Sequence, residues 1–416
     1  MTLASERRTD GGGTVGLVAA IGSVAAVGLG FSITLPLLAL TLEDRGISST
    51  WIGINTATWG LAAIAATPFV SKLAARIGTA QLLALSIFVL AVALPLFYLS
   101  PFWAWFILRL VGGAAVTTTF VLSEFWISSA APPARRGVIM GIYASVLSGG
   151  FALGPVILSL TGTQGLLPFI IGSCVLMLGI VPVLCGLPVA PRLDRREKHS
   201  FGRFLFLAPA ATGAALLFGT IETGAFALLP IYGQRVGHTR DLVILLGIGI
   251  TIGNILLQMP MGMLSDRMDR RKLLMIIAAF GLLGAAVLPL VASAFWPLMI
   301  ALAIWGGVIG SLYTVGLAHL GSRFTGSDLA AANAAFVFCY SLGGLIGPAT
   351  LGVAMDLWDP DGFAIGIGLF FAAYLAMLVI RMGLARLPSR GAQGGPQVGP
   401  KGDSNGVSKG GSKNVS

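Results

Sequence analysis

Pro260-Met-Gly-Met-Leu-Ser-Asp-Arg-Met-Asp-Arg-Arg-Lys272 decides the fold, because it places a dense group of charges between two apolar runs. The eleven residues Gly262–Lys272 contain two carboxylates and four cations. Leu242–Met259 before them and Leu273–Val291 after them contain no charged residue. Each run approaches the roughly 20 apolar residues that a membrane-spanning helix needs. We therefore expect Gly262–Lys272, here called the charged turn, to be a tight turn at a membrane surface.

The composition of the whole chain is that of a membrane protein. Hydrophobic residues make up 56% of its 416 residues, and charged residues make up only 10%. Soluble domains usually contain about 25% charged residues. Twelve runs are long and apolar enough to span a membrane, which predicts an all-α membrane protein with twelve transmembrane helices. The expected spans are 15–42, 50–72, 80–99, 102–127, 136–160, 166–188, 204–233, 241–264, 273–293, 295–321, 329–355 and 362–385.

The positive charges are unevenly distributed between the two sides of this predicted topology. If both termini lie on one side, that side receives 22 of the 26 Lys and Arg residues, and the opposite side receives three. Arg109 lies within a span. Such asymmetry places the positive side, and hence both termini, in the cytoplasm. It predicts a multi-pass protein of the cytoplasmic (inner) membrane, and it explains the net charge of +10 without a nucleic-acid partner.

The two halves of the chain repeat each other. Gly154-Pro155 recurs as Gly347-Pro348 after 193 residues, and Phe102-Trp103 recurs at the same offset. Internal repeats of this kind are typical of secondary transporters. A basic break near Pro191–Ser200 separates the halves. We expect an N-terminal tail over 1–14, six-helix bundles over 15–188 and 204–385, a linker over 189–203, and a disordered cytoplasmic tail over 386–416.

Ionisable residues divide the spans into two groups. The third, sixth and ninth spans contain none, and the twelfth contains only Arg381, near its end. The fourth, seventh and tenth spans contain Arg109, Glu124, Glu222 and His319. A charge inside a bilayer is costly and normally faces the bundle interior or an aqueous cavity. This pattern predicts outer helices that face lipid and inner helices that line a cavity.

With these features the chain resembles the major facilitator superfamily over about residues 15–385. The resemblance rests on twelve spans in two halves, the basic linker and the charged turn. Ser123-Glu-Phe-Trp126 and Arg136-Gly137 are further similar to the YcaD-like bacterial branch. The family implies two pseudo-symmetric six-helix bundles and alternating access to a cavity lined by the first, fourth, seventh and tenth helices.

The same resemblance implies that the charged turn is a gating loop. In that role Gly262 allows close approach of a helix end, and Asp266 faces the N-terminus of a neighbouring helix, expected to begin at Ser327-Asp328. Arg267, Arg270 and Arg271 flank this carboxylate. The alternative is a turn with a purely topological role. In the first half Ala75 replaces the aspartate, which predicts an unequal pair of loops.

Two further segments resemble family motifs. Arg109-Leu-Val-Gly-Gly113 resembles the fourth-helix motif associated with proton transfer, although an arginine does not release its own proton. Arg109 would instead hold an anionic substrate group, favour the ionised form of a nearby carboxylate, or serve as a structural ion-pair partner. Gly150–Pro155 resembles the fifth-helix antiporter motif without its later glycine pair. Close helix packing through Gly150, Gly154 and Pro155, repeated at Gly347 and Pro348, is the alternative interpretation.

Glu222 is the strongest candidate for chemistry. A lone carboxylate in the middle of a span is desolvated, and such a group can carry a proton. The alternative is a hydrogen-bonding role beside Thr220 and Thr223. His319, whose side-chain type titrates near neutrality, either passes a proton or makes an interfacial polar contact. For Glu124 a structural pair with Arg135 or Arg136 is favoured.

No nucleophile–base set, phosphate-binding loop or metal-ligand spacing occurs, so we expect no enzyme activity, no metal and no cofactor. The sequence predicts a monomeric secondary active transporter for a small molecule, working by alternating access in the lipid bilayer. Proton coupling is expected through Glu222, with Arg109 as its electrostatic partner. Export by antiport is one option, and the sequence leaves open the direction of transport and the choice between symport and antiport. A membrane sensor or assembly factor that retains the fold without transporting is the alternative.

Overall fold

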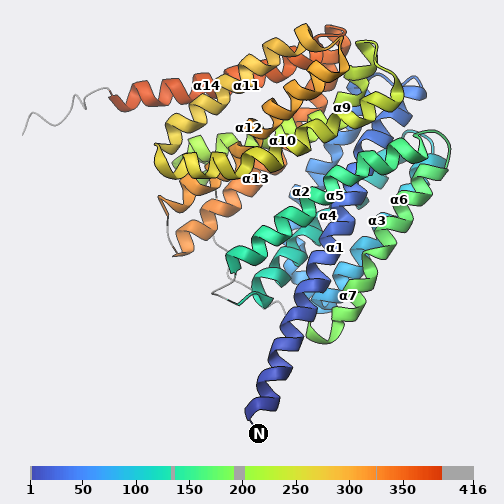
Figure 1. The fold of residues 1–416 in the computed structure, drawn as a ribbon, viewed down its shortest axis with the longest axis vertical. Helices are drawn as coiled ribbons and strands as arrows, with labels where there is room; N and C mark the ends of the chain where they lie inside the picture. The colour runs from blue at the N-terminus through green and yellow to red at the C-terminus, as the bar shows by residue number, and fades with distance from the viewer. Residues whose placement is uncertain (1, 133–135, 192–201, 325, 387–416) are drawn as a thin grey trace, which may run out of the picture.

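A computed structural model describes residues 2–132, 136–191, 202–324 and 326–386, and these residues form helices joined by short connections (Figure 1). The helices of the N-terminal half are α1 (Thr2–Asp44), α2 (Ser49–Ile77), α3 (Thr79–Leu99), α4 (Ala104–Ala130), α5 (Arg136–Thr161), α6 (Leu167–Leu178), α7 (Ile180–Gly186) and the short 3₁₀ helix η2 (Leu187–Val189). Those of the C-terminal half are α8 (Phe204–Leu207), α9 (Pro209–Arg235), α10 (Arg240–Arg267), α11 (Arg270–Val291), α12 (Phe295–Gly321), α13 (Gly326–Leu357) and α14 (Gly362–Arg386).

Eleven helical segments of the described chain are long and apolar enough to cross a membrane. This finding supports the expected all-helical, multi-pass membrane protein. The fifth expected span corresponds to α5, in which Ser145–Thr161 forms a shorter apolar helix. The full count of twelve therefore stays a prediction. Most of the expected linker and nearly all of the expected C-terminal tail lie outside the described residues.

Two expected spans are interrupted by proline. The span predicted over 166–188 divides into α6 and α7, because Pro182 has no backbone N–H for the carbonyl of Leu178, where α6 ends. The span predicted over 204–233 begins with the single turn α8. Ala208 then leaves helical geometry, with φ −128° and ψ 56°, as residues that precede a proline commonly do.

The charged turn is as tight as expected. Only Met268 and Asp269 separate the end of α10 from the start of α11. The Asp269 carboxylate accepts hydrogen bonds from the backbone N–H groups of Arg271 and Lys272, each at 3.0 Å. This is an N-cap, which satisfies donors that a helix start leaves unpaired. The helix expected to begin at Ser327-Asp328 begins one residue earlier, at Gly326.

Glycines bring the same pairs of helices together in both halves. A Cβ on Gly154 would collide with Ser32 of α1, and one on Gly347 would collide with Thr220 of α9. The Ser32 hydroxyl donates to the Gly150 carbonyl at 3.1 Å. These contacts pack α1 against α5 and α9 against α13, so the repeated glycines occupy equivalent helix interfaces.

The two halves meet closely along α2 and α13. A Cβ on Gly53 would collide with the Pro348 carbonyl, and a Cβ on Gly352 would collide with the Ser49 carbonyl. These contacts lie in the first half of α2, whose last turns are largely exposed. In Figure 1 the halves form two arms that diverge toward the charged turn, between α10 and α11, and converge at the other end.

Candidate functional site

A cavity of about 430 Å³ lies between the two halves and forms the candidate site. One wall comes from α5 of the N-terminal half, and the others come from α9, α10 and α12. Its polar lining residues are Tyr143, Ser145, Ser148, Glu222, Thr251, Asn254, Gln258, Tyr313 and Thr314, and its aromatic residues include Phe151, Phe218, Phe226 and Trp305. We call this space the central cavity. Its mixture of aromatic surface and a few polar groups is typical of small-molecule sites.

The helices that line the central cavity differ from those expected. The seventh and tenth spans, α9 and α12, do line it, but α5 and α10 take the places expected for α1 and α4. Phe151 of α5 explains this difference for α1. Its ring lies 5.8 Å from Phe31 of α1 and 5.8 Å from Phe226 of α9, so it screens α1 from the cavity.

Glu222 lies in the wall of the central cavity and is half-buried. The Tyr340 hydroxyl of α13 donates a hydrogen bond of 2.5 Å to its carboxylate. The Tyr340 ring packs against Phe218 at 6.1 Å and Tyr313 at 5.8 Å, which holds the hydroxyl in place. Sequence reasoning identified Glu222 from its depth in the span, but it did not identify Tyr340 as its partner.

Glu124 of α4 has a similar partner. It accepts a 2.9 Å hydrogen bond from Tyr143 of α5, a residue of the cavity wall. Tyr313 lies within electrostatic range of both Glu124 and Glu222. The carboxylates therefore approach one cavity from opposite halves. The expected pairing of Glu124 with Arg135 or Arg136 concerns side chains outside the described residues.

Arg109 lies away from Glu222. Its Nε donates to Asn55 Oδ1 of α2 at 3.2 Å, and it lines a separate small pocket within the N-terminal half. Glu222 is hydrogen-bonded to Tyr340 in the other half. The expected electrostatic partnership between Arg109 and Glu222 is thus not present in this structure, because α5 rather than α4 faces the central cavity.

His319 also lies outside the central cavity. It is 7% exposed near the end of α12, and its electrostatic neighbours are Arg323 and the charged-turn residues Asp269, Arg270 and Arg271. Its Nε2 has no hydrogen-bond partner among the described residues. The structure therefore places His319 behind the charged turn rather than beside the cavity.

The charged turn contacts little of the other half in this structure. Asp266 forms an ion pair of 3.4 Å with Arg270, one helical turn away, and its side chain is 77% exposed. A Cβ on Gly262 would meet no atom within 4 Å. The close approach expected at Gly262 is therefore absent here, because the two arms diverge at this end.

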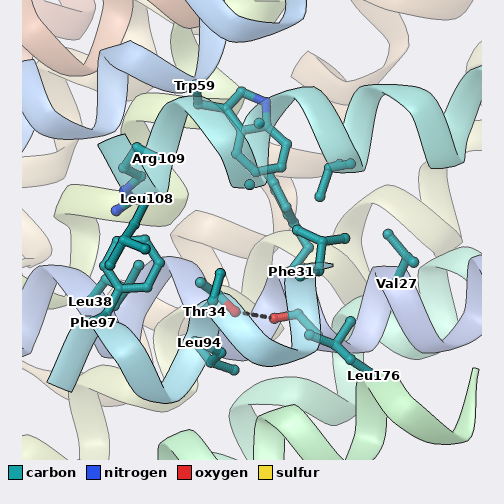
Figure 2. Close-up of a pocket in the computed structure, with 16 residues that line it drawn as sticks. Val27, Phe31, Thr34, Leu38, Trp59, Leu94, Phe97, Leu108, Arg109 and Leu176 are labelled. Atoms are coloured by element: carbon teal, nitrogen blue, oxygen red, sulfur yellow. Dashed lines mark hydrogen bonds between the residues drawn. The ribbon is translucent and has the colours of Figure 1, made fainter. Parts of the chain in front are cut away.

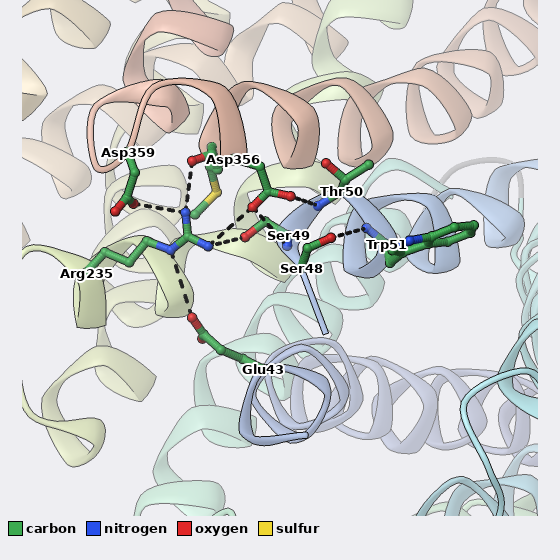
Figure 3. Close-up of polar contacts among 9 residues, drawn as sticks. Glu43, Ser48, Ser49, Thr50, Trp51, Arg235, Asp356 and Asp359 are labelled. Carbon is green, nitrogen blue, oxygen red and sulfur yellow. Dashed lines mark hydrogen bonds and ion pairs between the residues drawn. The ribbon is translucent and has the colours of Figure 1, made fainter. Parts of the chain in front are cut away.

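A polar cluster joins the halves at the opposite end (Figure 3). Arg235 of α9 forms ion pairs with Glu43 at 3.9 Å, Asp356 at 3.5 Å and Asp359 at 2.9 Å. It also donates to the Ser49 hydroxyl at 2.6 Å. Glu43 and Ser49 belong to the N-terminal half, so this guanidinium bridges both halves. We call these five residues the Arg235 cluster.

Arg240 adds a second bridge at this end. It pairs with Asp44 at 2.6 Å and donates to the Thr163 hydroxyl, and both partners belong to the N-terminal half. Within the described residues, the two ion pairs that join the halves, Arg235–Glu43 and Arg240–Asp44, both lie here. Sequence reasoning counted both arginines only toward membrane orientation. The adjacent acidic pair Glu43-Asp44 was the signal that it missed.

The described residues contain no group of three or more His, Cys, Asp or Glu side chains that could hold a metal ion. The cavity polar groups are hydroxyls, amides and one carboxylate, which can bind a small molecule or a proton.

Comparison with known proteins agrees with this architecture. The family model for the Major Facilitator Superfamily matches residues 20–254 and 214–402. The chain belongs to the major facilitator superfamily. The transporter YfkF of this superfamily from Bacillus subtilis (strain 168), itself uncharacterised, is 26% identical over 370 residues, which cover 86% of this chain and 93% of YfkF.

The transporter YcaD from Salmonella typhi, also uncharacterised, is 25% identical over 360 residues, or 85% of this chain and 93% of YcaD. Among solved structures, the nucleoside transporter NupG superposes with a TM-score of 0.70 at 15% identity, covering 89% of this chain and 99% of NupG. A bacterial homologue of the human lysosomal transporter Spinster, in an inward-facing and unoccupied conformation, gives 0.66 at 16% identity, covering 89% and 95%. The family and these relatives support a role in membrane transport.

Proposed function

We propose that the protein is a secondary active transporter that moves a small amphipathic molecule by alternating access, coupled to protons through Glu222. The half-buried Glu222 carboxylate in the wall of a cavity between the two halves carries this proposal. A carboxylate in such a place can bind a proton or a polar group of the cargo, but one oxygen pair does not hold both. Because cargo and protons compete for the same carboxylate, each crossing of the cargo is exchanged for a proton that crosses in the opposite direction. The proposed direction is therefore efflux of the cargo, driven by protons that enter the cell.

The lining of the central cavity supports the proposed class of cargo. Its described lining residues include Glu222 and aromatic rings, and they include no Lys, Arg or His. Aromatic faces and a carboxylate favour neutral or cationic groups over anions. Asn254 and Gln258 add amide groups that can hydrogen-bond the cargo.

The proposed cycle uses the two ends of the molecule. We place the charged turn and both termini in the cytoplasm of a monomeric protein with two six-helix bundles, 15–188 and 204–385, in the cytoplasmic membrane. In that orientation the Arg235 cluster holds the outer end together while the cytoplasmic ends diverge, which corresponds to an inward-facing state. The outward-facing state would break the Arg235 cluster and bring the charged turn against the other half.

Transport by reconstituted protein tests the proposal. A thermal-shift screen of the purified protein against metabolites and drugs selects a cargo, whose pH-gradient-driven flux is then measured in proteoliposomes. Glu222→Gln is expected to lose gradient-driven flux and its pH dependence but to retain exchange of labelled for unlabelled cargo. Asp241→Asn, which removes an exposed carboxylate of α10, is the matched control and is expected to behave as wild type. Normal pH-dependent transport by Glu222→Gln would contradict the proposal.

A further inference from the structure

Arg109 is a buried cation that has no anionic partner among the described residues. Its side chain is 3% exposed, and its described polar contact is with the neutral amide of Asn55. Its guanidinium carbon lies 5.9 Å from the centre of the Phe97 ring, another neutral group. The guanidinium stays protonated in proteins. A buried charge is normally stabilised by a counter-charge, so Arg109 lacks the group that its surroundings require.

Arg109 lacks not only a counter-charge but also partners for nearby hydrogen-bond donors. Arg109 Nη2 is buried without a hydrogen-bond partner, and so is Asn55 Nδ2, on the same amide that accepts from Arg109 Nε. Asn55 itself is fully buried. Two buried donors on bonded neighbours without an acceptor are unusual, because buried polar groups are nearly always hydrogen-bonded. A bound acceptor that carries negative charge would supply both the missing counter-charge and a partner for the unused guanidinium donor of Arg109.

A pocket is available beside Arg109 (Figure 2). It lies within the N-terminal half, between α1, α2, α3, α4 and α6, and its volume is about 40 Å³. Phe31, Trp59 and Phe97 form much of its wall, and Thr34 contributes a hydroxyl that currently donates to Gly30 O at 2.6 Å. One water needs at least about 10–15 Å³ of such space, so the pocket admits a monatomic ion but no organic acid of ordinary size.

We propose that this pocket binds a small monovalent anion of chloride size through the Arg109 guanidinium. Asn55 orients the guanidinium by accepting from Nε at Oδ1, and the Thr34 hydroxyl, which also lines the pocket, can rotate to provide a second donor. The anion neutralises Arg109 inside the N-terminal half, where the apolar walls exclude a hydrated cation. This site is separate from the central cavity, so it does not depend on the proposed transport mechanism.

Thermal stability in defined salts tests the anion site. The purified full-length protein in detergent is melted in sodium gluconate and in mixtures with sodium chloride at constant ionic strength. Gluconate is too large for the pocket. Chloride is expected to raise Tm saturably, by about 2 °C or more at saturation, as binding to the native state requires. Sodium bromide is expected to act similarly. A chloride-independent Tm for the wild type would overturn the proposal.

Variants locate the effect. Asn55→Asp places a carboxylate beside Arg109, so this variant is expected to lose the chloride response while melting in gluconate at about the wild-type Tm in chloride. Arg109→Met is expected to lose the response as well. Arg45→Gln is the matched control: Arg45 donates to the Ser100 and Tyr98 carbonyls of the same half, so the variant is expected to keep the response. An unchanged chloride response in Asn55→Asp would overturn the site even if Arg109→Met does not fold.

Discussion

At the residue scale, tyrosines from neighbouring helices position the carboxylate in the cavity wall and a second carboxylate that is bonded to a wall residue. Tyr340 donates to Glu222, and Tyr143 donates to Glu124. Pro36 of α1 recurs as Pro230 of α9 after 194 residues, and at this offset Glu222 corresponds to Gly28. At the offset of 193 that relates Gly154-Pro155 to Gly347-Pro348, Tyr340 corresponds to Leu147, and Gly28 and Leu147 contact each other in the N-terminal half. The same interface thus holds a polar pair in one half and an apolar contact in the other.

Tyr340→Phe tests the importance of this positioning for transport. The substitution keeps the ring contacts with Phe218 and Tyr313 and removes only the donor to Glu222. A hydrogen bond to a charged group contributes about 1.5–3 kcal/mol, so gradient-driven transport is expected to fall by about tenfold or more. Tyr374→Phe is the control, because Tyr374 donates to the Ala210 carbonyl at 2.7 Å outside the cavity. Equal loss in both variants would indicate a general packing defect instead.

Sequence identified the intramembrane ionisable residues because charge in a bilayer is rare and therefore conspicuous. It did not identify their partners. Glu222 and Tyr340 are 118 residues apart, and hydropathy contains no information about which helices face each other. For the same reason sequence did not indicate that Arg109 lies outside the central cavity, since depth in a span does not specify the side of the helix that faces the cavity.

At the element scale, α2 and α13 form the closest contact between the halves. Glycines on both helices let the two backbones touch, as at Gly53 with Pro348 and at Gly352 with Ser49. On α5, by contrast, a Cβ at Gly149 would meet no atom within 4 Å. Close packing between the halves is therefore concentrated on one pair of helices.

Gly53→Ala is expected to push α2 away from α13 and to lower the stability of the conformation described here. Overpacking typically costs about 1–3 kcal/mol, which corresponds to a Tm decrease of several degrees in detergent. Gly149→Ala should leave Tm unchanged or raise it, because alanine favours helix and meets open space. A wild-type Tm for Gly53→Ala would show that the two helices separate without cost.

Most helices were predictable from apolar run lengths, and the charged turn was predictable from its charge density. The divisions at Gly179 and Ala208 were not, because hydropathy does not register the missing N–H group of Pro182 or the backbone restriction that Pro209 places on Ala208. The repeated glycines correctly indicated close helix packing, and the structure adds the partners, α1 with α5 and α9 with α13.

At the scale of the whole molecule, the two ends of the interface between the halves differ. One end carries the Arg235 cluster and the Arg240–Asp44 pair, and the charged turn at the other end is exposed. Sequence could not predict this difference, since it depends on the conformational state rather than on residue type. The resemblance pointed to the charged turn as the gate, whereas the engaged contacts in this state are at the far end.

Opposite effects of Arg235→Gln and Asp266→Asn are expected on the conformational equilibrium. Spin labels at Leu73 and Leu264, both exposed, would report the separation of the arms by electron paramagnetic resonance in a background without Cys174, Cys185 and Cys339. Arg235→Gln weakens the end at which the Arg235 cluster joins the halves. It should therefore increase the population in which the two spin labels lie close together. Asp266→Asn should decrease that population, because it weakens the state in which the charged turn is packed.

Arg45→Gln is again the control for these distances, since the hydrogen bonds that Arg45 makes among the described residues, to the carbonyls of Tyr98 and Ser100, lie within its own half. Label distances that do not respond to Arg235→Gln would show that the Arg235 cluster does not hold its end of the two halves together.

The position of the glycine contacts along α2 also determines how far the end of this helix moves when the two halves rotate. The last of these contacts is at Gly60, against Leu345, and α2 continues for another 17 residues to Ile77. That segment is about 26 Å long. Rotation of the halves about the glycine contacts would move its tip by about 0.4 Å per degree, so a rotation of about 20° displaces the tip by roughly 9 Å. The glycine contacts lie near one end of α2. A small rearrangement of backbone contacts at that end therefore opens a passage of molecular width at the other end.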